Sequence, residues 1–462
     1  MELPKEESIP ILVVPFPAQG HLNQLLHFSL TLASHGFPVH FACSSVHNRQ
    51  ARDRIRGWSS ESLHNITFHD IPIPSLPSNV PNPNSAHKFP SHILPVWDSV
   101  LRVIRSPLSS LLRSLSSSSP RLILVHDPLM SFVAHDAAAV PSVETYKFQC
   151  ISALTQLSFI WESNGKASTE DNDILFSPLE DTITEGVQDF LNVYYIETPA
   201  EGIVLNTCRA IEGPFIDLLG KEDDFISKKM FAVGPISPVI VQSPQRHACL
   251  EWLDKQPPES VVYVAFGSTT TLSDEQVKEI AVGLERSTQR FIWVLRDADR
   301  GDVSSVEGEV NREKSLLTDF DERVEGVGMV VRGWAPQLDI LAHPSTAAFM
   351  SHCGWNSCME GMSMGLPILT WPMHSDQPRH ALMITEYLKV GVMVRDWGKR
   401  NETTKGEEVE MAVKKVMVDE QGKEIRRRAK EMGESIRAAT KEGGSSHEEL
   451  EAFIAHITRR VE

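Results

Sequence analysis

The feature that most constrains the fold is the alternation of short apolar runs with helical patterns along the whole chain. This alternation is typical of parallel sheets whose strands are joined by crossover helices. The predicted strands are Ile9–Pro15, Pro38–Cys43, Ile66–Ile71, Leu122–His126 and Gly202–Leu205 in the first half, and Val261–Phe266, Phe291–Leu295, Gly328–Val331, Ala347–Met350 and Ile368–Trp371 in the second. We therefore expect an α/β protein built from two doubly wound, Rossmann-like domains.

The domain boundary is predicted where the helical pattern lapses, at Gly234–Gln245, because prolines and serines suit an exposed linker. We expect a first domain over residues 1–240 and a second over 241–444. Residues 445–462 follow a glycine pair and form a separate amphipathic helix. The 462-residue length allows two or three domains. Three stretches, Ser106–Ser119, Ser168–Gly186 and Asp297–Asp321, are predicted to be mobile surface.

Composition excludes several classes of function. Lys and Arg total 44 against 61 Asp and Glu, a formal net charge of −17, so nucleic acid is not an expected partner. The six cysteines show no pairing rhythm and the first residues are acidic, which predicts a reduced, cytoplasmic protein without a secretory signal. Ile11–Val14 is too short to span a bilayer, so no membrane insertion is expected. Nothing in the chain requires more than a monomer.

The segment from Trp334 to Gln377 contains two junctions between a strand and a helix. At the first, Trp334, Ala335 and Gln337 follow a predicted strand, and the indole offers a flat face on which a base can stack. Gln337 can reach a ribose hydroxyl. These features predict a nucleotide site at the carboxyl end of the strand.

The second junction turns through His352 and Gly354 into a helix that starts near Trp355, Asn356 and Ser357. Free N–H groups and the helix dipole form an anion site there, which His352, Asn356 and Ser357 complete for a pyrophosphate. Glu360 lies about one turn further on and can accept hydrogen bonds from ribose. Asp376 and Gln377 close the segment and can hold hexose hydroxyls. In a separate loop, Ser268 is expected to contact the β-phosphate, or to cap the helix that begins at Asp274.

A catalytic base is predicted near the start of the chain. His21 follows the first strand and enters a helix expected near Leu22, at the strand end where α/β sheets bind ligands. The helix N-terminus disfavours imidazolium and is expected to keep the ring neutral. Asp127 directly follows another strand and can fix the tautomer of His21; the alternative is that Asp127 only caps the next helix. Asp136 is expected to lie too far along that helix.

The Trp334–Gln377 segment resembles, from end to end, the signature box of plant family 1 UDP-glycosyltransferases. The resemblance implies a GT-B fold whose two domains face a central cleft, with a C-terminal helix that crosses back to the first domain. It also implies an inverting transfer with UDP-glucose as donor substrate, no metal and no permanently bound cofactor. The implied ligand contacts are Trp334 on uracil, Gln337 and Glu360 on ribose, His352, Asn356 and Ser357 on the phosphates, and Trp355, Asp376 and Gln377 on the sugar.

A finer resemblance points to the zeatin O-glucosyltransferase subgroup. Gln24 occupies a place where the family often has proline, and LVHDPLMSFVAHDAA, CLEWLDKQ and MSHCGWNSCMEG resemble that subgroup. The implied acceptor is a hydroxyl of a small lipophilic plant metabolite such as the cytokinin zeatin. Flavonoids, other phenols, terpenoids and an existing sugar remain alternatives. The candidates for the acceptor pocket are Phe16, Phe89, Leu94, Trp97, Phe148 and Tyr195; the alternative for each of them is a place in the core, because aromatic residues are usually buried.

Other classes of protein fit less well. A dinucleotide dehydrogenase lacks its signature here, since no G-x-G-x-x-G follows a predicted strand. A zinc site from His352, Cys353 and Cys358 has the spacing of no usual finger. A hormone or nucleotide-sugar binder without turnover is disfavoured because His21 and Asp127 are both present.

Overall fold

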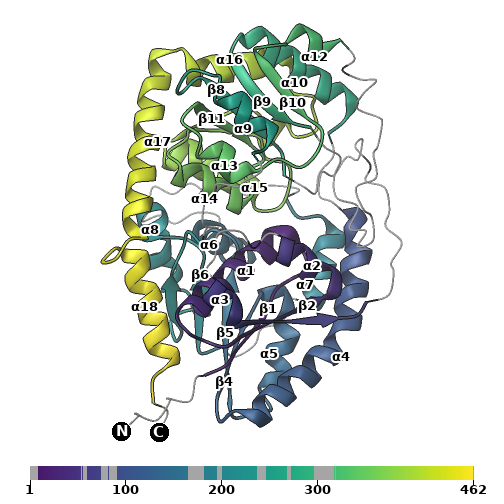
Figure 1. Cartoon of the computed structure of the whole chain (residues 1–462), viewed down its shortest axis with the longest axis vertical. Helices are drawn as coiled ribbons and strands as arrows, with labels where there is room; N and C mark the ends of the chain where they lie inside the picture. Colours follow the sequence, from purple (N-terminus) through teal and green to yellow (C-terminus); the bar gives the residue numbers. More distant parts are fainter. Residues whose placement is uncertain are drawn as a thin grey trace.

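The computed structural model describes residues 9–53, 55, 60–73, 82, 91–164, 182–194, 200–236, 246–267, 272–295, 317 and 319–460. Two parallel sheets dominate it, one in each half of the chain (Figure 1). The predicted fold class, two doubly wound α/β domains, is confirmed. Among the described residues, no helix combines the length and the apolar character needed to cross a membrane.

The first sheet has seven parallel strands in the order β3-β2-β1-β4-β5-β6-β7. Its inner strands β1 and β4 are buried throughout and apolar except for His126, as expected where helices cover both faces of a parallel sheet. The strand bounds are β1 Ile11–Val14, β2 Val39–Ser44, β3 Ile66–Ile71, β4 Leu122–His126, β5 Val143–Gln149, β6 Gly202–Leu205 and β7 Lys229–Ala232. The helices of this domain are α1 Gln19–Ser34, α2 Ser45–Asp53, α3 Ser60–His64, α4 Leu94–Ser118, α5 Ser131–Ala137, α6 Ala153–Ser163, α7 Glu185–Tyr194 and α8 Arg209–Leu219, with short 3₁₀ turns at Ser91–Ile93 and Pro128–Met130.

The second sheet has six parallel strands in the order β10-β9-β8-β11-β12-β13. Its bounds are β8 Val261–Ala265, β9 Arg290–Val294, β10 Gly328–Val331, β11 Thr346–Ser351, β12 Ile368–Thr370 and β13 Gly391–Met393. The helices are α9 Ala248–Leu253, α10 Asp274–Ser287, α12 Phe320–Arg323, α13 Gln337–Leu341, α14 Trp355–Ser363, α15 Gln377–Leu382, α16 Gly406–Met417 and α17 Glu420–Ala439, with a π-helical turn at Met383–Tyr387 and a 3₁₀ turn at Trp397–Lys399.

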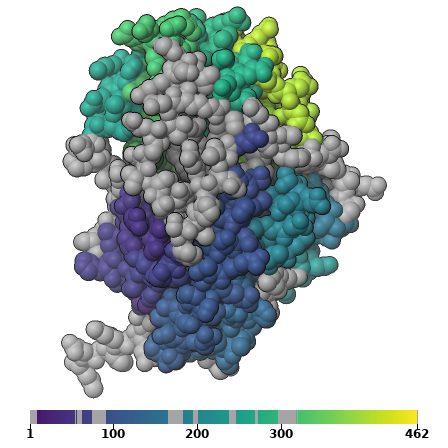
Figure 2. All heavy atoms as spheres, turned by 90° about the vertical axis from the view of Figure 1, so that its right-hand side faces the viewer, coloured from purple at the N-terminus to yellow at the C-terminus, as the bar shows by residue number. Residues whose placement is uncertain are grey.

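The chain returns to the first domain at its end. α17 packs against α14 of the second domain and α8 of the first, and the last helix, α18 Ser445–Ile457, packs on β7 (Figure 1). Phe453 of α18 is fully buried in a cluster with Phe28 and Phe148. The expected crossing of the C-terminal helix is therefore observed. Figure 2 shows the molecule from the side of α4, with the blue surface of the first domain below the green surface of the second.

The Ser-rich stretch Ser106–Ser119 is not the mobile surface that was predicted. All but its last residue lies in α4, where Leu108 and Leu112 are buried. Serine hydroxyls, such as that of Ser110, donate to carbonyls one turn back, so their polar groups are satisfied within the helix. Nearly all of the other two stretches, and most of the predicted linker, lie outside the described residues.

Three strands were not predicted from sequence. β7 and β13 are short edge strands. β5 lies inside the sheet, but its sequence VETYKFQ interrupts the apolar pattern with charged residues. Glu144 of β5 pairs with Arg121 at 2.7 Å and with Arg459, beyond α18, at 3.1 Å. The charge of Glu144, which makes the strand hard to recognise in the sequence, is thus neutralised in part by Arg459, near the end of the chain.

Candidate active site

His21 and Asp127 meet at the carboxyl ends of two adjacent strands. β1 leads into α1, which begins at Gln19, and His21 lies in its first turn. β4 ends directly before Asp127. The two strands pair in parallel register, so the residues that follow them meet at one sheet edge. Nδ1 of His21 lies 2.6 Å from Oδ2 of Asp127. The geometry fits an N–H donor on Nδ1, which leaves Nε2 free to accept a proton.

Asp127 has both of the roles weighed from sequence. Its Oδ1 accepts the backbone N–H of Leu129 and caps the short 3₁₀ helix that follows. Its Oδ2 holds His21 and accepts a longer contact, 3.5 Å, from the thiol of Cys150. The carboxyl group is fully buried, so three partners fix its orientation. Asp136 is instead on α5, next to Ser109 and Arg105 of α4.

The pKa of His21 shifts in a direction that differs from the one expected at a helix N-terminus. Burial disfavours the imidazolium, but the charge and hydrogen bond of Asp127 outweigh this effect, with a further contribution from the charge of Asp376. The pKa of His21 is therefore raised above 6.5, the direction opposite to the one expected from the helix N-terminus alone.

The Trp334–Gln377 segment, which we call the donor box, begins with its first junction: Trp334 follows β10, and Gln337 starts α13. Trp334 is 52 % exposed, with His247 near its edge, so a face of the indole is open to solvent. Ala335 is nearly buried, and its carbonyl accepts the N–H of Gln337, the first residue of α13. The Gln337 amide donates to Oγ of Ser357 at 3.0 Å and to Glu360 at 2.7 Å. Residues 20 or more positions apart thus form one polar cluster.

Glu360 and His352 have shifted pKa values for the same physical reason. Burial raises the pKa of Glu360 to about 7, opposed only by its hydrogen bond from Gln337. Burial lowers the pKa of His352 to about 4, so the ring is neutral at physiological pH. Nδ1 of His352 has no protein partner within the described residues.

The turn before α14 is fitted closely around His352. A Cβ on Gly354 would lie 2.5 Å from Nε2 of His352, and one on Gly267 would lie 2.8 Å from it. Gly267 also has a φ of +77°, which favours glycine. Gly354 immediately precedes α14, whose first N–H groups have no side-chain cap. The backbone there is positioned to bind an anion.

Two donor-box side chains reach the first domain. The Asn356 amide donates to the carbonyl of Gly20 at 2.8 Å, one residue before His21. The buried indole of Trp355 donates to the carbonyl of Asn206 at 2.7 Å. The Trp355 N–H is therefore already used by the protein. The base and the N-terminus of α14 face each other across the domain junction.

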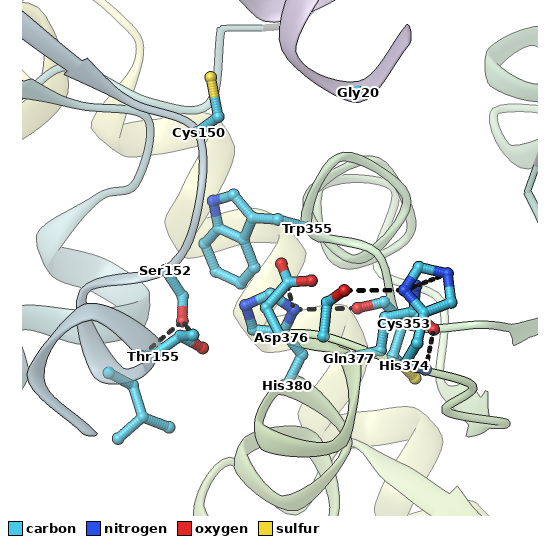
Figure 3. A network of polar contacts seen from close by, with 12 residues as sticks. Gly20, Cys150, Ser152, Thr155, Cys353, Trp355, His374, Asp376, Gln377 and His380 are labelled. Atoms are coloured by element: carbon cyan, nitrogen blue, oxygen red, sulfur yellow. Dashed lines mark hydrogen bonds and ion pairs between the residues drawn. The ribbon is translucent and has the colours of Figure 1, made fainter. Parts of the chain in front are cut away.

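Asp376 and Gln377 lie at the start of α15, beside Trp355 (Figure 3). Oδ2 of Asp376 is 3.5 Å from the buried ring of His380, and the Trp355 ring lies against that ring, tilted by 32°, with a centroid separation of 4.9 Å. The carbonyl of the Gln377 side chain accepts the N–H groups of Met373 and His374. Gln377 is thus buried and shapes the loop, whereas Asp376 is more open. Ser268 lies outside the described residues.

Sequence reasoning missed three groups near the site. Cys150 follows β5, a strand that was not predicted, so its position could not be inferred. Asn206 directly follows the predicted strand β6, a signal that could have been used. His380 lies one helical turn after Asp376, a spacing that places both on one face.

Of the acceptor candidates, Phe16 and Trp97 lie near the base. The Phe16 ring is 5.3 Å from His21 and 5.0 Å from Trp97. Leu94 starts α4, one turn before Trp97. Phe148 and Phe16 are both fully buried, Phe148 in the core with Phe28, which agrees with the alternative that these rings are core residues, whereas Trp97 is only partly buried. Phe89 and Tyr195 lie outside the described residues.

Two family models match the chain. The model described as glycosyltransferase, N-terminal domain covers residues 7–238, and that described as UDP-glucoronosyl and UDP-glucosyl transferase covers residues 229–429. Among curated proteins, the zeatin O-glucosyltransferase of Phaseolus lunatus is 45 % identical, over 99 % of this chain and 98 % of its own. The zeatin O-xylosyltransferase of Phaseolus vulgaris is 44 % identical, over 99 % and 100 %.

Solved structures agree. A UDP-glucosyltransferase from Polygonum tinctorium capable of glucosylating indoxyl superposes with a TM-score of 0.78 at 28 % identity, over 97 % of this chain and 98 % of its own. A Phytolacca americana protein complexed with UDP-2fluoro-glucose and pterostilbene gives 0.77 at 27 %, over 99 % and 100 %. With both halves matched and relatives aligned end to end, the chain belongs to the UDP-glycosyltransferase family and is an enzyme of that family.

Proposed function

We propose that the protein transfers glucose from UDP-glucose to a hydroxyl group of a small apolar plant metabolite, with inversion at the anomeric carbon. The observation that carries the proposal is the 2.6 Å contact between His21 and the buried Asp127, placed opposite the N-terminus of α14. A protein that only binds a hormone or a nucleotide sugar does not need a base that is held in this way. The zeatin O-glucosyltransferase relatives indicate the acceptor class.

The donor is proposed to lie along the box in the order of the sequence. Uracil stacks on the exposed face of Trp334, beside the backbone of Ala335. Ribose hydroxyls bond to Glu360 and Gln337, which already contact each other. The remaining proposed contacts are His352, Gly354, Asn356, Ser357 and Ser268 to the phosphates, and Trp355, Asp376 and Gln377 to the hexose.

Two of these assignments need a rearrangement or a different atom. The Asn356 amide must turn from the Gly20 carbonyl to reach a phosphate. The Trp355 contact is assigned to its backbone N–H at the start of α14, because its indole N–H is held by Asn206. The buried Gln377 amide acts on the sugar chiefly by fixing the loop that carries Asp376.

In the proposed reaction, the acceptor hydroxyl gives its proton to Nε2 of His21 as its oxygen attacks the anomeric carbon. Asp127 stabilises the imidazolium that forms. The bond from the anomeric carbon to the UDP oxygen breaks, and the charge that grows on UDP is stabilised by the N–H groups of α14. An α-linked donor gives a β-glucoside.

The transfer is proposed to need no metal ion. Ligand atoms of His21, Asp127 and Cys150 do lie within 4.8 Å of one another, a separation that a metal could bridge. A metal there would occupy the base. Turnover that is unchanged by a chelator supports the proposal, and loss of turnover restored by a divalent ion contradicts it.

The acceptor is proposed to be zeatin or a molecule of similar size, held near His21 by the partly buried Trp97, whose ring packs on the fully buried Phe16. Flavonoid, phenolic, terpenoid and glycoside acceptors are the alternative outcomes of the assay. We further propose a cytoplasmic monomer with domains at 1–240, 241–444 and 445–462 that binds no nucleic acid. All six cysteines are buried and unpaired, which suits a reducing compartment.

The test is a product assay with the purified protein, UDP-glucose and a panel of trans-zeatin, a flavonol, an isoflavone, a simple phenol, a terpenoid alcohol and a monoglucoside, read by mass. UDP-xylose in place of UDP-glucose tests the donor, since glucosyl and xylosyl transferases are equally similar relatives. We expect a zeatin glucoside from the wild type and none from His21→Ala. Product from His21→Ala at the wild-type rate would refute the assigned base.

A further inference from the structure

Gln24 lies buried on α1, one turn after Gly20 and on the same helix as His21. Its amide nitrogen donates to the carbonyl of Gly20 at 3.0 Å and to that of Cys150 at 2.9 Å. Its amide oxygen accepts from the side chain of Asn206 at 2.6 Å. Both ends of the amide are thus used, and one side chain joins α1 to the carboxyl ends of β5 and β6.

Asn206 extends these contacts to the second domain. Its side-chain oxygen accepts the N–H of Ile236 at 2.9 Å, and its backbone carbonyl accepts the indole N–H of Trp355 at 2.7 Å. Asn206 is buried, so each of these bonds is shielded from water. The first residue of α14 is therefore tied to Gln24 through a single intermediate residue.

A second set of hydrogen bonds joins α1 and α14 until the Asn356 amide turns to a donor phosphate. The Gly20 carbonyl accepts both the Gln24 amide and the Asn356 amide of α14. Gly20 precedes His21 directly. The carbonyl of Cys150 is held by Gln24, while its thiol contacts Asp127. Gln24 is therefore bonded to a neighbour of each member of the catalytic pair: to Gly20, which precedes His21, and to Cys150, which contacts Asp127.

We propose that Gln24 and Asn206 form a positioning pair, which sets the distance between His21 and the N-terminus of α14. This inference rests on the proposed function, in which His21 takes a proton from an acceptor that attacks a sugar held at α14. Neither residue touches the reacting atoms. A proline at position 24 could make none of the three side-chain bonds and would lack a helical N–H. The pair is thus a property of chains with glutamine at this place.

The kinetic test compares Gln24→Leu, Asn206→Ala and the double variant with wild type. A misplacement of about 1 Å can cost about 100-fold in rate. We expect kcat for glucoside formation to fall about 10- to 100-fold in each single variant, while KM for UDP-glucose changes less than about threefold. The double variant should be no slower than the slower single variant, because the two residues act as one unit. Ser29→Ala, which removes a buried hydroxyl elsewhere on α1, is the matched control.

Two further measurements separate this idea from simple loss of folding. Gln24→Glu keeps the size and the acceptor of the side chain but turns its donor into an oxygen facing two carbonyls, so the melting temperature should fall and kcat, measured well below that temperature, should fall as well. Hydrogen exchange should rise in Gln24→Leu both near residues 19–24 and near residues 352–357. Unchanged kcat in variants of an active enzyme, additive losses, or faster exchange confined to residues 19–24 would overturn the pairing. A wild type without product on any acceptor would instead refute the proposed function, and the exchange result would still decide the pairing.

Discussion

At the scale of single residues, the contact between His21 and Asp127 predicts the pH dependence of the reaction. The base must be neutral to accept a proton, and its pKa lies above 6.5. Activity should therefore rise with pH through that raised pKa. In Asp127→Asn, burial remains but the charge is lost, so the pKa of His21 falls.

We expect kcat/KM of Asp127→Asn to drop on the order of 10³- to 10⁴-fold, with its acid limb moved to lower pH. A pH–rate profile of both proteins measures this. Asp136→Asn, on a helix away from the pair, should leave the limb in place. An acid limb that stays where it is in Asp127→Asn would contradict the assigned partnership.

Glu360 predicts a second pH effect, on binding rather than on rate. Burial raises the pKa of its carboxyl group to about 7. As a carboxylate it accepts ribose hydroxyls, so the affinity for UDP should decrease as the pH falls from about 8 to about 6. Titration calorimetry should show this slope in wild type and a flat response in Glu360→Gln. Glu285→Gln, at an exposed ion pair, should behave as wild type.

The ligand contacts assigned to Gln337, Ser357 and Glu360 stay predictions. That these three residues belong to one site was anticipated from the two junctions between strand and helix. The site around Gln24 and Asn206 was not, because a buried amide carries no chemistry of its own and its partners come from distant strands. The direction of the His21 shift was also missed, since a 2.6 Å contact cannot be read from a sequence.

At the scale of elements, the β11–α14 junction is sensitive to one added carbon. A Cβ at Gly354 would lie 2.5 Å from His352, so the ring must move away from the anion site. Overpacking costs about 1 to 3 kcal/mol, which corresponds to roughly 5- to 150-fold. We expect Gly354→Ala to weaken UDP binding within this range, measured by calorimetry. Gly333→Ala is the control, because nothing lies within 4 Å of its Cβ, and equal losses in both variants would refute the argument.

Elements were predicted best where burial was uniform along the strand. β1, β4 and β8 are buried at every position and were located correctly. β5 was missed because the charge of Glu144 is satisfied by Arg121 and Arg459, contacts that exist only after folding. The helix α1 begins three residues earlier than predicted, at Gln19 and not Leu22. Local sequence does not reveal partners that tertiary structure supplies.

At the scale of the whole molecule, α18 contributes to the stability of the first domain although it is the last element of the chain. Phe453 is fully buried against Phe28 and Tyr146. Removing such a ring from a core costs about 3 to 5 kcal/mol. We expect Phe453→Ala to lower the free energy of unfolding by this amount in denaturant titrations. Met411→Ala, at a site 56 % exposed, should change it by no more than about 0.5 kcal/mol.

The return of the chain also limits how the domains can move. The polypeptide passes between them twice, once between β7 and α9 and once between α17 and α18. A body attached at two points swings about the line through them and resists twisting or sliding. Each closure of the domains after product release should therefore bring the N-terminus of α14 back opposite Gly20 and His21 along the same arc. Because the two chain connections restrict the relative motion of the domains, the enzyme would return to the same domain orientation at every turnover.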